Sequence, residues 1–267
     1  LVDYTPHYIK IGGQSRLARW GAQWFSTATA NLCNQVVAPS AKFKRVLQEQ
    51  NVHRPIHTIP NGIDLSIFKA AKNSGSFRNR LGLKPDTPIL LSVGRVDPEK
   101  RLDFLIDAFA LMADRIPEAQ LVFAGDGSAR KKLEEQVAAT KVKDRIHFLG
   151  MVKRAELPDL LHDATIFLSA STTEVHPLSV IEAIASGLPL VAVQDEAFEG
   201  MVVENENGHL TPLDVNVFSD TLVAVLSDPE KLERYGKRSM ELSEKYSIEG
   251  QVRTLENLYV EAILQNR

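Results

Sequence analysis

The sequence IFLSASTTEVHPLSVIEAIASGLPLVAV, residues 166–193, predicts two buried strands joined by a polar loop and a helix. Residues 166–168 and 188–193 are apolar enough to lie inside a sheet that is covered on both faces. The polar loop between them carries Glu174, and the helix that follows carries Glu182. In open parallel sheets, ligands bind beyond the carboxyl ends of the strands, where this loop lies. We therefore expect this segment to form part of a ligand site.

Glu182 is the single carboxylate in the apolar run 180–185. An ionised carboxylate on a buried helix costs several kcal/mol unless another group pairs with it. One interpretation is a structural glutamate with a hydrogen-bonding partner at the start of the helix. The other is a ligand contact, in which Glu182 accepts hydrogen bonds from a pair of hydroxyls, as ribose-binding carboxylates do.

Strands and helices alternate along the chain, which predicts an α/β fold: a Rossmann-like parallel sheet with helices on both faces. A change to small and polar residues over 69–88 marks the best candidate for a domain boundary. The other predicted strands are 35–38, 56–59, 89–93, 120–124 and 146–149; the other predicted helices are 14–31, 40–49, 101–116, 129–140, 154–162, 215–227, 229–246 and 248–265.

The overall composition is that of an ordinary globular protein of 267 residues with a net charge of −3. This charge argues against a general nucleic-acid-binding protein. The single cysteine, Cys33, excludes an internal disulfide and is consistent with the cytoplasm. No run of sequence approaches the roughly 20 apolar residues that a membrane span needs.

A group of basic residues follows the strand predicted at 89–93. Asp97 is suited to cap a helix that begins at Pro98. Lys100 and Arg101 would then lie in the first helical turn, where each positive charge costs about 0.3–1 kcal/mol. An anion shared with the helix amides would explain these cations, and Arg95 would reach the same anion. Solvated cations paired with neighbouring carboxylates explain them equally well.

Several glycines lie at predicted strand ends. Gly125 and Gly127 lack the third glycine of the dinucleotide fingerprint, so a tight turn with Ser128 as the helix cap also explains them. At Gly150 the backbone either turns or approaches a flat ligand such as a base. His176 is isolated, and a packed or exposed ring is a simpler interpretation than a ligand contact. No cluster of side chains has the spacing of a metal site.

The predicted helix 14–31 carries an aromatic stripe that includes Leu17, Trp20, Trp24 and Phe25. Aromatic residues at helical spacing usually face a core, and we expect this stripe to be buried. The alternative is an amphipathic surface that touches lipid headgroups.

Together these motifs resemble the retaining glycosyltransferases of family four, which have the GT-B fold of two facing Rossmann-like domains. The resemblance covers nearly the whole chain, and the order and spacing of the motifs are more specific than any single motif. The motifs are Pro60-Asn61-Gly62-Ile63-Asp64, Gly94-Arg95 with Lys100, Gly125-Asp126-Gly127, Phe148-Leu149-Gly150, Asn207-Gly208, and the pair Glu174 and Glu182.

The resemblance implies transfer of a hexose from a nucleotide sugar to a hydroxyl acceptor, with retained anomeric configuration and without a metal or another cofactor. Arg95 and Lys100 would hold the donor diphosphate, Glu182 the ribose, and Glu174 the sugar, so that Glu174, Arg95 and Lys100 form the catalytic set. The implied donor-binding set is Gly94, Arg95, Lys100, Gly125, Gly127, Met151, Val152, Glu174, His176, Leu178, Ser179 and Glu182, with Met151 and Val152 facing the base. A non-catalytic nucleotide-sugar-binding module and a GT-B sugar-nucleotide epimerase are the alternatives.

The resemblance also implies a domain division. Residues 1–68 would be the end of an acceptor-side N-terminal domain, residues 69–247 the donor-binding domain, and residues 248–267 a helix that packs back on the N-terminal domain. Because most of the N-terminal domain would precede Leu1, we expect this chain to bind the donor and to be inactive alone.

A finer similarity concerns the acceptor. The segments SASTTEVHPLSVIEA and DEAFEG, the second at 195–200, are similar to those of bacterial diacylglycerol glucosyltransferases. This similarity favours a UDP-sugar, a lipid acceptor such as diacylglycerol, and peripheral contact with the inner face of the membrane. Pro177 departs from the glycine of many family members; because proline has no N–H, one contact to the sugar or phosphate would be absent.

Overall fold

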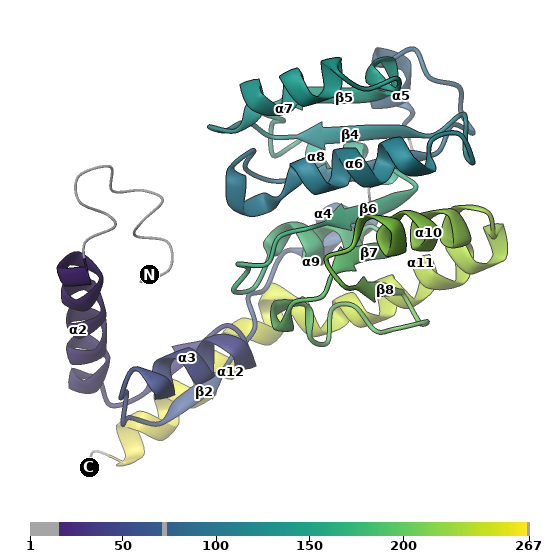
Figure 1. Cartoon of the computed structure of the whole chain (residues 1–267). Coiled ribbons are helices and arrows are strands. Elements are labelled where there is room, and N and C mark those ends of the chain that lie inside the picture. The colour runs from purple at the N-terminus through teal and green to yellow at the C-terminus, as the bar shows by residue number, and fades with distance from the viewer. Residues whose placement is uncertain (1–15, 71–73, 266–267) are drawn as a thin grey trace. The chain divides into compact units, whose positions relative to one another are not determined.

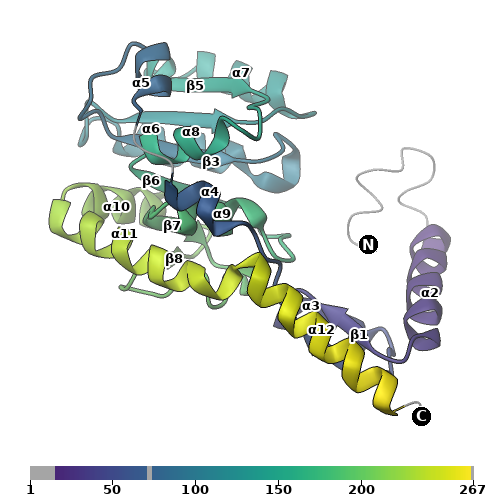
Figure 2. The same cartoon turned by 180° about the vertical axis from the view of Figure 1, so that it is seen from behind.

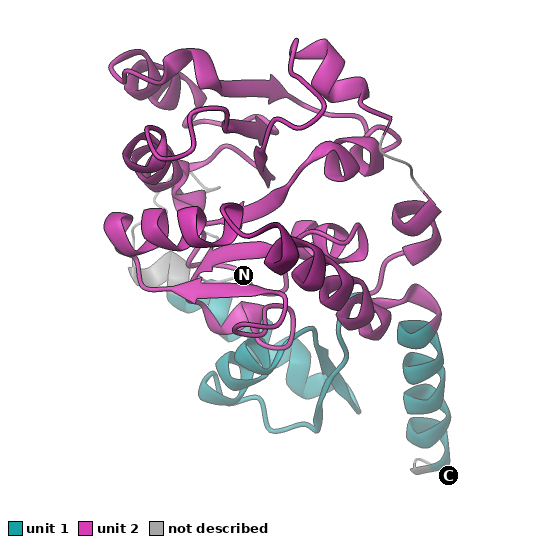
Figure 3. Ribbon diagram, turned by 90° about the vertical axis from the view of Figure 1, so that its right-hand side faces the viewer, with its two compact units in different colours: residues 1–61, 250–267 teal, residues 62–249 magenta. Residues whose placement is uncertain are grey.

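The computed structural model describes residues 16–70 and 74–265 (Figures 1 and 2). The chain forms two compact units, Leu1–Asn61 with Gly250–Arg267, and Gly62–Glu249 (Figure 3). The last helix, α12 (Ile248–Gln265), therefore begins in the larger unit and continues in the smaller one.

The boundary between the units lies before the one expected at residues 68 and 69. Ile63 forms a parallel bridge with Ser247, and Phe68 is buried in the core of the larger unit. These contacts join the segment after Asn61 to the larger unit, although its composition does not distinguish it from the residues before it.

Among its described residues, the smaller unit has two short parallel strands and three helices. Val36 is paired with Ile56, and Ser40 caps helix α3 by accepting a hydrogen bond from the Phe43 N–H. A small core lies under these elements, made of Ala38, Leu47, Val52 and Ile56. The elements are α2 (Arg16–Leu32), β1 (Val36–Ala38), α3 (Ala41–Glu49), β2 (Ile56–Thr58) and most of α12.

The prediction that the aromatic stripe of α2 is buried is wrong for the residues whose side chains are described. Trp20, Trp24 and Phe25 are 65%, 62% and 68% exposed. Two three-residue strands offer little apolar surface, and α2 contributes Ala30 to the small core instead. The side chain of Leu17 lies outside the described residues.

The larger unit is built on the predicted parallel sheet, whose six strands have the order β5-β4-β3-β6-β7-β8. Successive crossovers run outward from β3 in one direction and from β6 in the other, so the strand order reverses between these two neighbours. The strands are β3 (Ile89–Val93), β4 (Gln120–Ala124), β5 (Ile146–Gly150), β6 (Ile166–Ser169), β7 (Leu190–Val193) and β8 (Gly208–Thr211). Ligands of open α/β sheets bind at this reversal.

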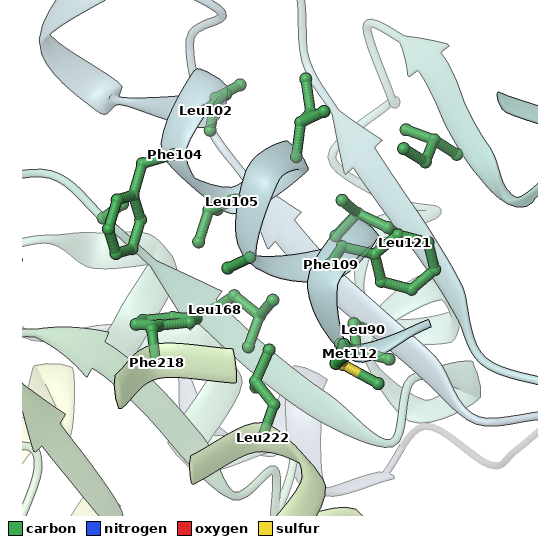
Figure 4. Close-up of a cluster of buried hydrophobic side chains, with 14 of the residues drawn as sticks. Leu90, Leu102, Phe104, Leu105, Phe109, Met112, Leu121, Leu168, Phe218 and Leu222 are labelled. Atoms are coloured by element: carbon green, nitrogen blue, oxygen red, sulfur yellow. The ribbon is translucent and has the colours of Figure 1, made fainter. Parts of the chain in front are cut away.

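Alternate residues of the strands fill two cores, one on each face of the sheet. Leu90 faces the core shown in Figure 4, in which Phe104 and Phe218 pack edge to face, whereas Leu91 faces the opposite core. The first core is covered by α6 (Leu102–Met112), α7 (Arg130–Ala138) and α10 (Val215–Leu226). The second is covered by α4 (Leu65–Ala70), α5 (Ser76–Arg80), α8 (Leu157–Asp163) and α9 (Leu178–Ala185). Helix α11 (Pro229–Ser243) packs beside α9, and single turns of 3-10 helix are η1 (Pro98–Lys100), η2 (Lys143–Arg145), η3 (Glu196–Phe198) and η4 (Glu244–Tyr246).

Strand β8 was not predicted from the sequence. Its four residues include a single large apolar side chain, Leu210, and its first residue is Gly208. A Cβ atom on Gly208 would lie 2.2 Å from the carbonyl oxygen of Leu190, so close pairing with β7 requires glycine there.

A long-range cap joins α5 to α8. Asp163, the last residue of α8, is fully buried. Its carboxylate accepts hydrogen bonds from the backbone N–H groups of Gly75, Phe77 and Arg78, at 2.9, 2.8 and 3.3 Å. These are amides at the start of α5 that have no partner within that helix.

Candidate functional site

A pocket lies where the carboxyl ends of β3 and β6 meet, at the reversal of strand order. The segments that follow these two strands supply its charged side chains. Of the predicted site residues, the pocket brings together Gly94, Arg95, Lys100, Glu174 and Ser179, and it is also lined by Ser92, Ser169 and Ser171.

Lys100 and Glu174 form an ion pair across this pocket. Lys100 comes from η1 and Glu174 from the loop between β6 and α9. Their side chains are 21% and 13% exposed, so the pair is largely withdrawn from water. An anion that enters the pocket can therefore contact Lys100 only in competition with Glu174.

The predicted helix start at Pro98, with Asp97 as its cap, is wrong. Pro98–Lys100 forms a single 3-10 turn, and Arg101 adopts a left-handed conformation with φ of 50° before α6 begins at Leu102. The Asp97 side chain makes no capping hydrogen bond to this turn. Lys100 consequently does not lie in the first turn of α6, and the unfavourable interaction with the dipole of that helix does not apply to it.

Arg95 is held by two carboxylates of its own loop. Its guanidinium donates to Asp97 at 2.5 Å and to Glu99 at 2.8 Å. Asp97 in turn accepts from the backbone N–H and hydroxyl of Ser128, which therefore does not cap α7 as predicted. Burial alone would raise the pKa of Asp97, but the bonds from Ser128 and the charge of Arg95 lower it overall. The result is an ionised Asp97 that fixes the guanidinium beside the pocket.

The glycines of the β3 and β4 loops allow two backbones to touch. A Cβ atom on Gly125 would lie 1.8 Å from the Gly94 carbonyl oxygen, and one on Gly127 would lie 2.4 Å from that of Val96. Gly125 also has φ of 141° and donates to the Gly150 carbonyl at 2.8 Å. Both glycines are therefore needed for close backbone packing, and neither of them lines the pocket.

Glu182 lies in α9 and is paired with Arg154, which follows β5. The distance between Arg154 Nη1 and Glu182 Oε1 is 2.5 Å. The Glu182 side chain is 5% exposed, whereas the Arg154 side chain is 69% exposed. Burial raises the pKa of Glu182, and the hydrogen bond and charge of Arg154 oppose this shift. The buried carboxylate of Glu182 is thus paired with an exposed arginine that was not predicted from the sequence.

His176 packs against Tyr246, with 5.7 Å between the ring centroids. Burial lowers the pKa of His176 to about 4 and raises that of Tyr246 to about 12, so both rings are neutral at pH 7. This geometry agrees with the simpler interpretation of His176 as a packed ring. Pro177 precedes α9 as its N-cap residue, and Leu178 is 44% exposed.

Met151 and Val152 follow β5, apart from the residues that line the pocket. Met151 is 79% exposed, whereas Val152 packs against the second core. The described residues contain no group of three or more His, Cys, Asp or Glu side chains that could hold a metal ion. No helix in the described part of the chain is both long and apolar enough to cross a membrane.

Two family models match the chain. Residues 73–242 match the model described as glycosyl transferases group 1, and residues 3–67 match glycosyltransferase family 4. Together they extend over both units.

Similar curated proteins include two alpha-monoglucosyldiacylglycerol synthases. The protein from Acholeplasma laidlawii is 26% identical over 99% of this chain, which spans 68% of that protein. The protein from Streptococcus pneumoniae is 29% identical over 86% of this chain, which spans 53% of that protein.

Similar solved structures share the fold of both units. Sucrose-phosphate synthase from Thermosynechococcus elongatus matches 99% of this chain and 66% of its own, with a TM-score of 0.84 and 25% identity. Anabaena HepE in complex with UDP and glucose matches 90% of this chain and 67% of its own, with a TM-score of 0.83 and 20% identity. The predicted GT-B fold is confirmed by these structures.

Proposed function

Since the chain belongs to the glycosyl transferases group 1 family, we propose that it binds a nucleoside diphosphate sugar in the pocket between β3 and β6, as the donor-binding part of a retaining hexosyltransferase. The Lys100–Glu174 ion pair at the reversal of strand order carries this proposal. It puts a cation for a diphosphate and a carboxylate for sugar hydroxyls in one pocket, at the place where α/β sheets bind nucleotides.

The chemistry follows from the charges of the pocket. When the bond between the anomeric carbon and the diphosphate breaks, negative charge develops on the departing phosphate. Lys100 and Arg95 stabilise this charge, and Asp97 and Glu99 hold Arg95 in place for it. We propose that these side chains, rather than a metal ion, balance the charge of the diphosphate.

The remaining donor contacts are assigned by the same proposal. Glu182, held by Arg154, accepts from the ribose hydroxyls, and the backbone at Met151 and Val152 faces the base. The nucleotide is UDP, in keeping with the UDP bound in Anabaena HepE. The sugar end of the donor lies next to Glu174.

Calorimetric titration with UDP and UDP-glucose tests the donor site. Lys100→Ala and Glu182→Ala are each expected to weaken UDP binding by about tenfold or more, because each removes a charged partner of the ligand. Lys237→Ala is the matched control, since Lys237 also pairs with a glutamate but lies in α11 with its side chain 67% exposed. Unchanged affinity in both site variants would refute the assignment of the site.

We further propose that the acceptor is a lipid such as diacylglycerol, met by peripheral contact with the inner face of the membrane. Two relatives are alpha-monoglucosyldiacylglycerol synthases by name. Trp20, Trp24 and Phe25 are exposed on α2. Positions 4–48 carry six Lys and Arg residues and no Asp or Glu, in a chain with a net charge of −3. A segment that combines exposed aromatic side chains with an excess of positive charge favours an anionic lipid surface.

Sedimentation with lipid vesicles tests this second proposal. The double variant Trp20→Ala and Trp24→Ala is expected to lose most of its association with vesicles that contain an anionic lipid. Tyr259→Ala removes an aromatic side chain that is 70% exposed on α12 and is expected to bind as the unaltered chain does. Equal sedimentation of all three proteins would exclude α2 as the lipid-binding element.

A further inference from the structure

Few buried polar side-chain atoms in the described residues lack a hydrogen-bond partner, and two of them lie in one loop. Ser171 Oγ and His176 Nδ1 both belong to the loop between β6 and α9. The others, spread over the larger unit, are Arg78 Nε, Thr211 Oγ1 and Ser219 Oγ. Since buried polar groups are nearly always satisfied, each such atom requires an explanation.

Ser171 differs from the rest because it lines the pocket. Its side chain is 1% exposed, and its hydroxyl has no partner among the described residues. The same pocket contains Lys100 and Glu174. Ser219 is equally buried but lies in α10, next to Phe218 of the first core and outside this pocket. A buried hydroxyl without a partner costs stability, and at Ser171 a ligand in the pocket can remove that cost.

We propose that the Ser171 hydroxyl donates a hydrogen bond to a phosphate oxygen of the donor diphosphate, as a further substrate-positioning residue. This inference rests on the proposed donor site. Ser171 precedes Glu174 by three positions in the same loop, so one short segment would contact both the phosphate and the sugar.

The chemistry of the pocket favours a phosphate as the acceptor. A serine hydroxyl has one proton to donate, and phosphate oxygens only accept. Lys100 in the same pocket would attract the phosphate, and a hydrogen bond to a charged acceptor is stronger than one to a neutral acceptor. The carboxylate of Glu174 is already paired with Lys100.

Titration of the full chain with UDP tests the inference. Ser171→Ala is expected to weaken UDP binding about tenfold, because a hydrogen bond to a charged group is lost. Ser219→Ala is the matched control and is expected to change it less than about twofold, because it removes a hydroxyl of equal burial outside the pocket. Ser171→Cys keeps the size of the side chain with only a weak donor and should bind UDP as poorly as Ser171→Ala.

Thermal unfolding without nucleotide separates binding from folding. Because a buried hydroxyl without a partner in the described structure costs stability, Ser171→Ala and Ser219→Ala should both raise the Tm slightly above that of the unaltered chain. UDP should then raise the Tm of Ser171→Ala less than that of Ser219→Ala.

Two results would overturn the role of Ser171 alone: equal UDP affinity in Ser171→Ala and Ser219→Ala, or a loss seen with UDP-glucose but not with UDP. If the unaltered chain itself binds neither UDP nor UDP-glucose, the donor site fails first. The two failures are therefore distinguishable.

Discussion

Glu174→Gln is expected to tighten the binding of UDP while removing a group proposed to contact the sugar. The substitution keeps the size of the side chain and removes the charge that is paired with Lys100. Because the diphosphate is proposed to bind the same ammonium group, we expect the carboxylate of Glu174 to oppose the binding of UDP in the unaltered chain. Glutamine leaves Lys100 available to the phosphate.

The magnitude follows from the burial of the pair. Fully exposed ion pairs contribute about 0.2–1 kcal/mol, and removing one partner of a buried pair costs about 3–5 kcal/mol. With side chains that are 21% and 13% exposed, the Lys100–Glu174 pair lies between these limits. We take about 1–2 kcal/mol, which corresponds to a gain in UDP affinity of about 5–30-fold.

Calorimetry at low and high salt measures this gain, which should shrink at high salt because screening weakens the competing pair. Asp220→Asn is the control, since Asp220 pairs with Arg115 on exposed surface. The gain should be smaller for UDP-glucose than for UDP, because the proposed sugar contact is lost. Unchanged or weaker UDP binding in Glu174→Gln would show that the carboxylate does not compete for Lys100.

Three further predictions concern stability. Glu182→Gln should stabilise the fold by about 1 kcal/mol at pH 7. Burial raises the pKa of Glu182, so ionisation of this group opposes folding as the pH rises through its pKa in the folded chain. Urea unfolding at pH 4 and pH 7 measures the gain, and an equal gain at both would contradict this cause. His176→Gln should reduce the stability that is lost as the pH falls from 6.5 to 4, by about 2 kcal/mol at most after solvent screening. Burial lowers the pKa of His176 to about 4, so the ring protonates first in the unfolded chain. Parallel curves of unfolding free energy against pH for the variant and the unaltered chain would argue against this cause. Asp163→Ala should lower the free energy of unfolding in urea by about 3 kcal/mol, because three amides lose their acceptor. Substitution of the exposed Asp220 by Ala should lower it by less than about 0.5 kcal/mol. Equal losses would exclude the capping role.

Five of the six strands of the sheet and half of the site could be predicted because their signals are local. The runs 89–93 and 120–124 are buried on both faces, so their apolar character marks β3 and β4 to the residue. Lys100 and Glu174 follow strands that become neighbours at the reversal of order, and the topology alone brings their loops together.

The remainder depends on contacts that no local pattern records. Arg154 is an exposed arginine like many others, and nothing near it in the sequence shows that it meets Glu182, 28 positions away. Asp163 caps a helix that lies 86 positions earlier in the chain. Arg101 ends η1 in a left-handed conformation, although its neighbours favour a continuous helix. Arg154 and Asp163 make tertiary contacts that the sequence around them does not indicate. At Arg101 the tertiary structure overrides the helix propensity of the segment.

The loop between β6 and α9 carries a consequence for protein engineering. Ser171 and His176 hold buried atoms without partners in the described structure, and the buried Glu182 follows in α9. A screen that selects only for thermostability would favour apolar replacements at these three positions, because each removes a polar group that the fold tolerates at a cost. On the donor contacts proposed for Ser171 and Glu182, such a screen would weaken nucleotide binding while every measure of folding improved. Libraries built on this scaffold should therefore keep 171–182 fixed, or select for nucleotide binding in the same round.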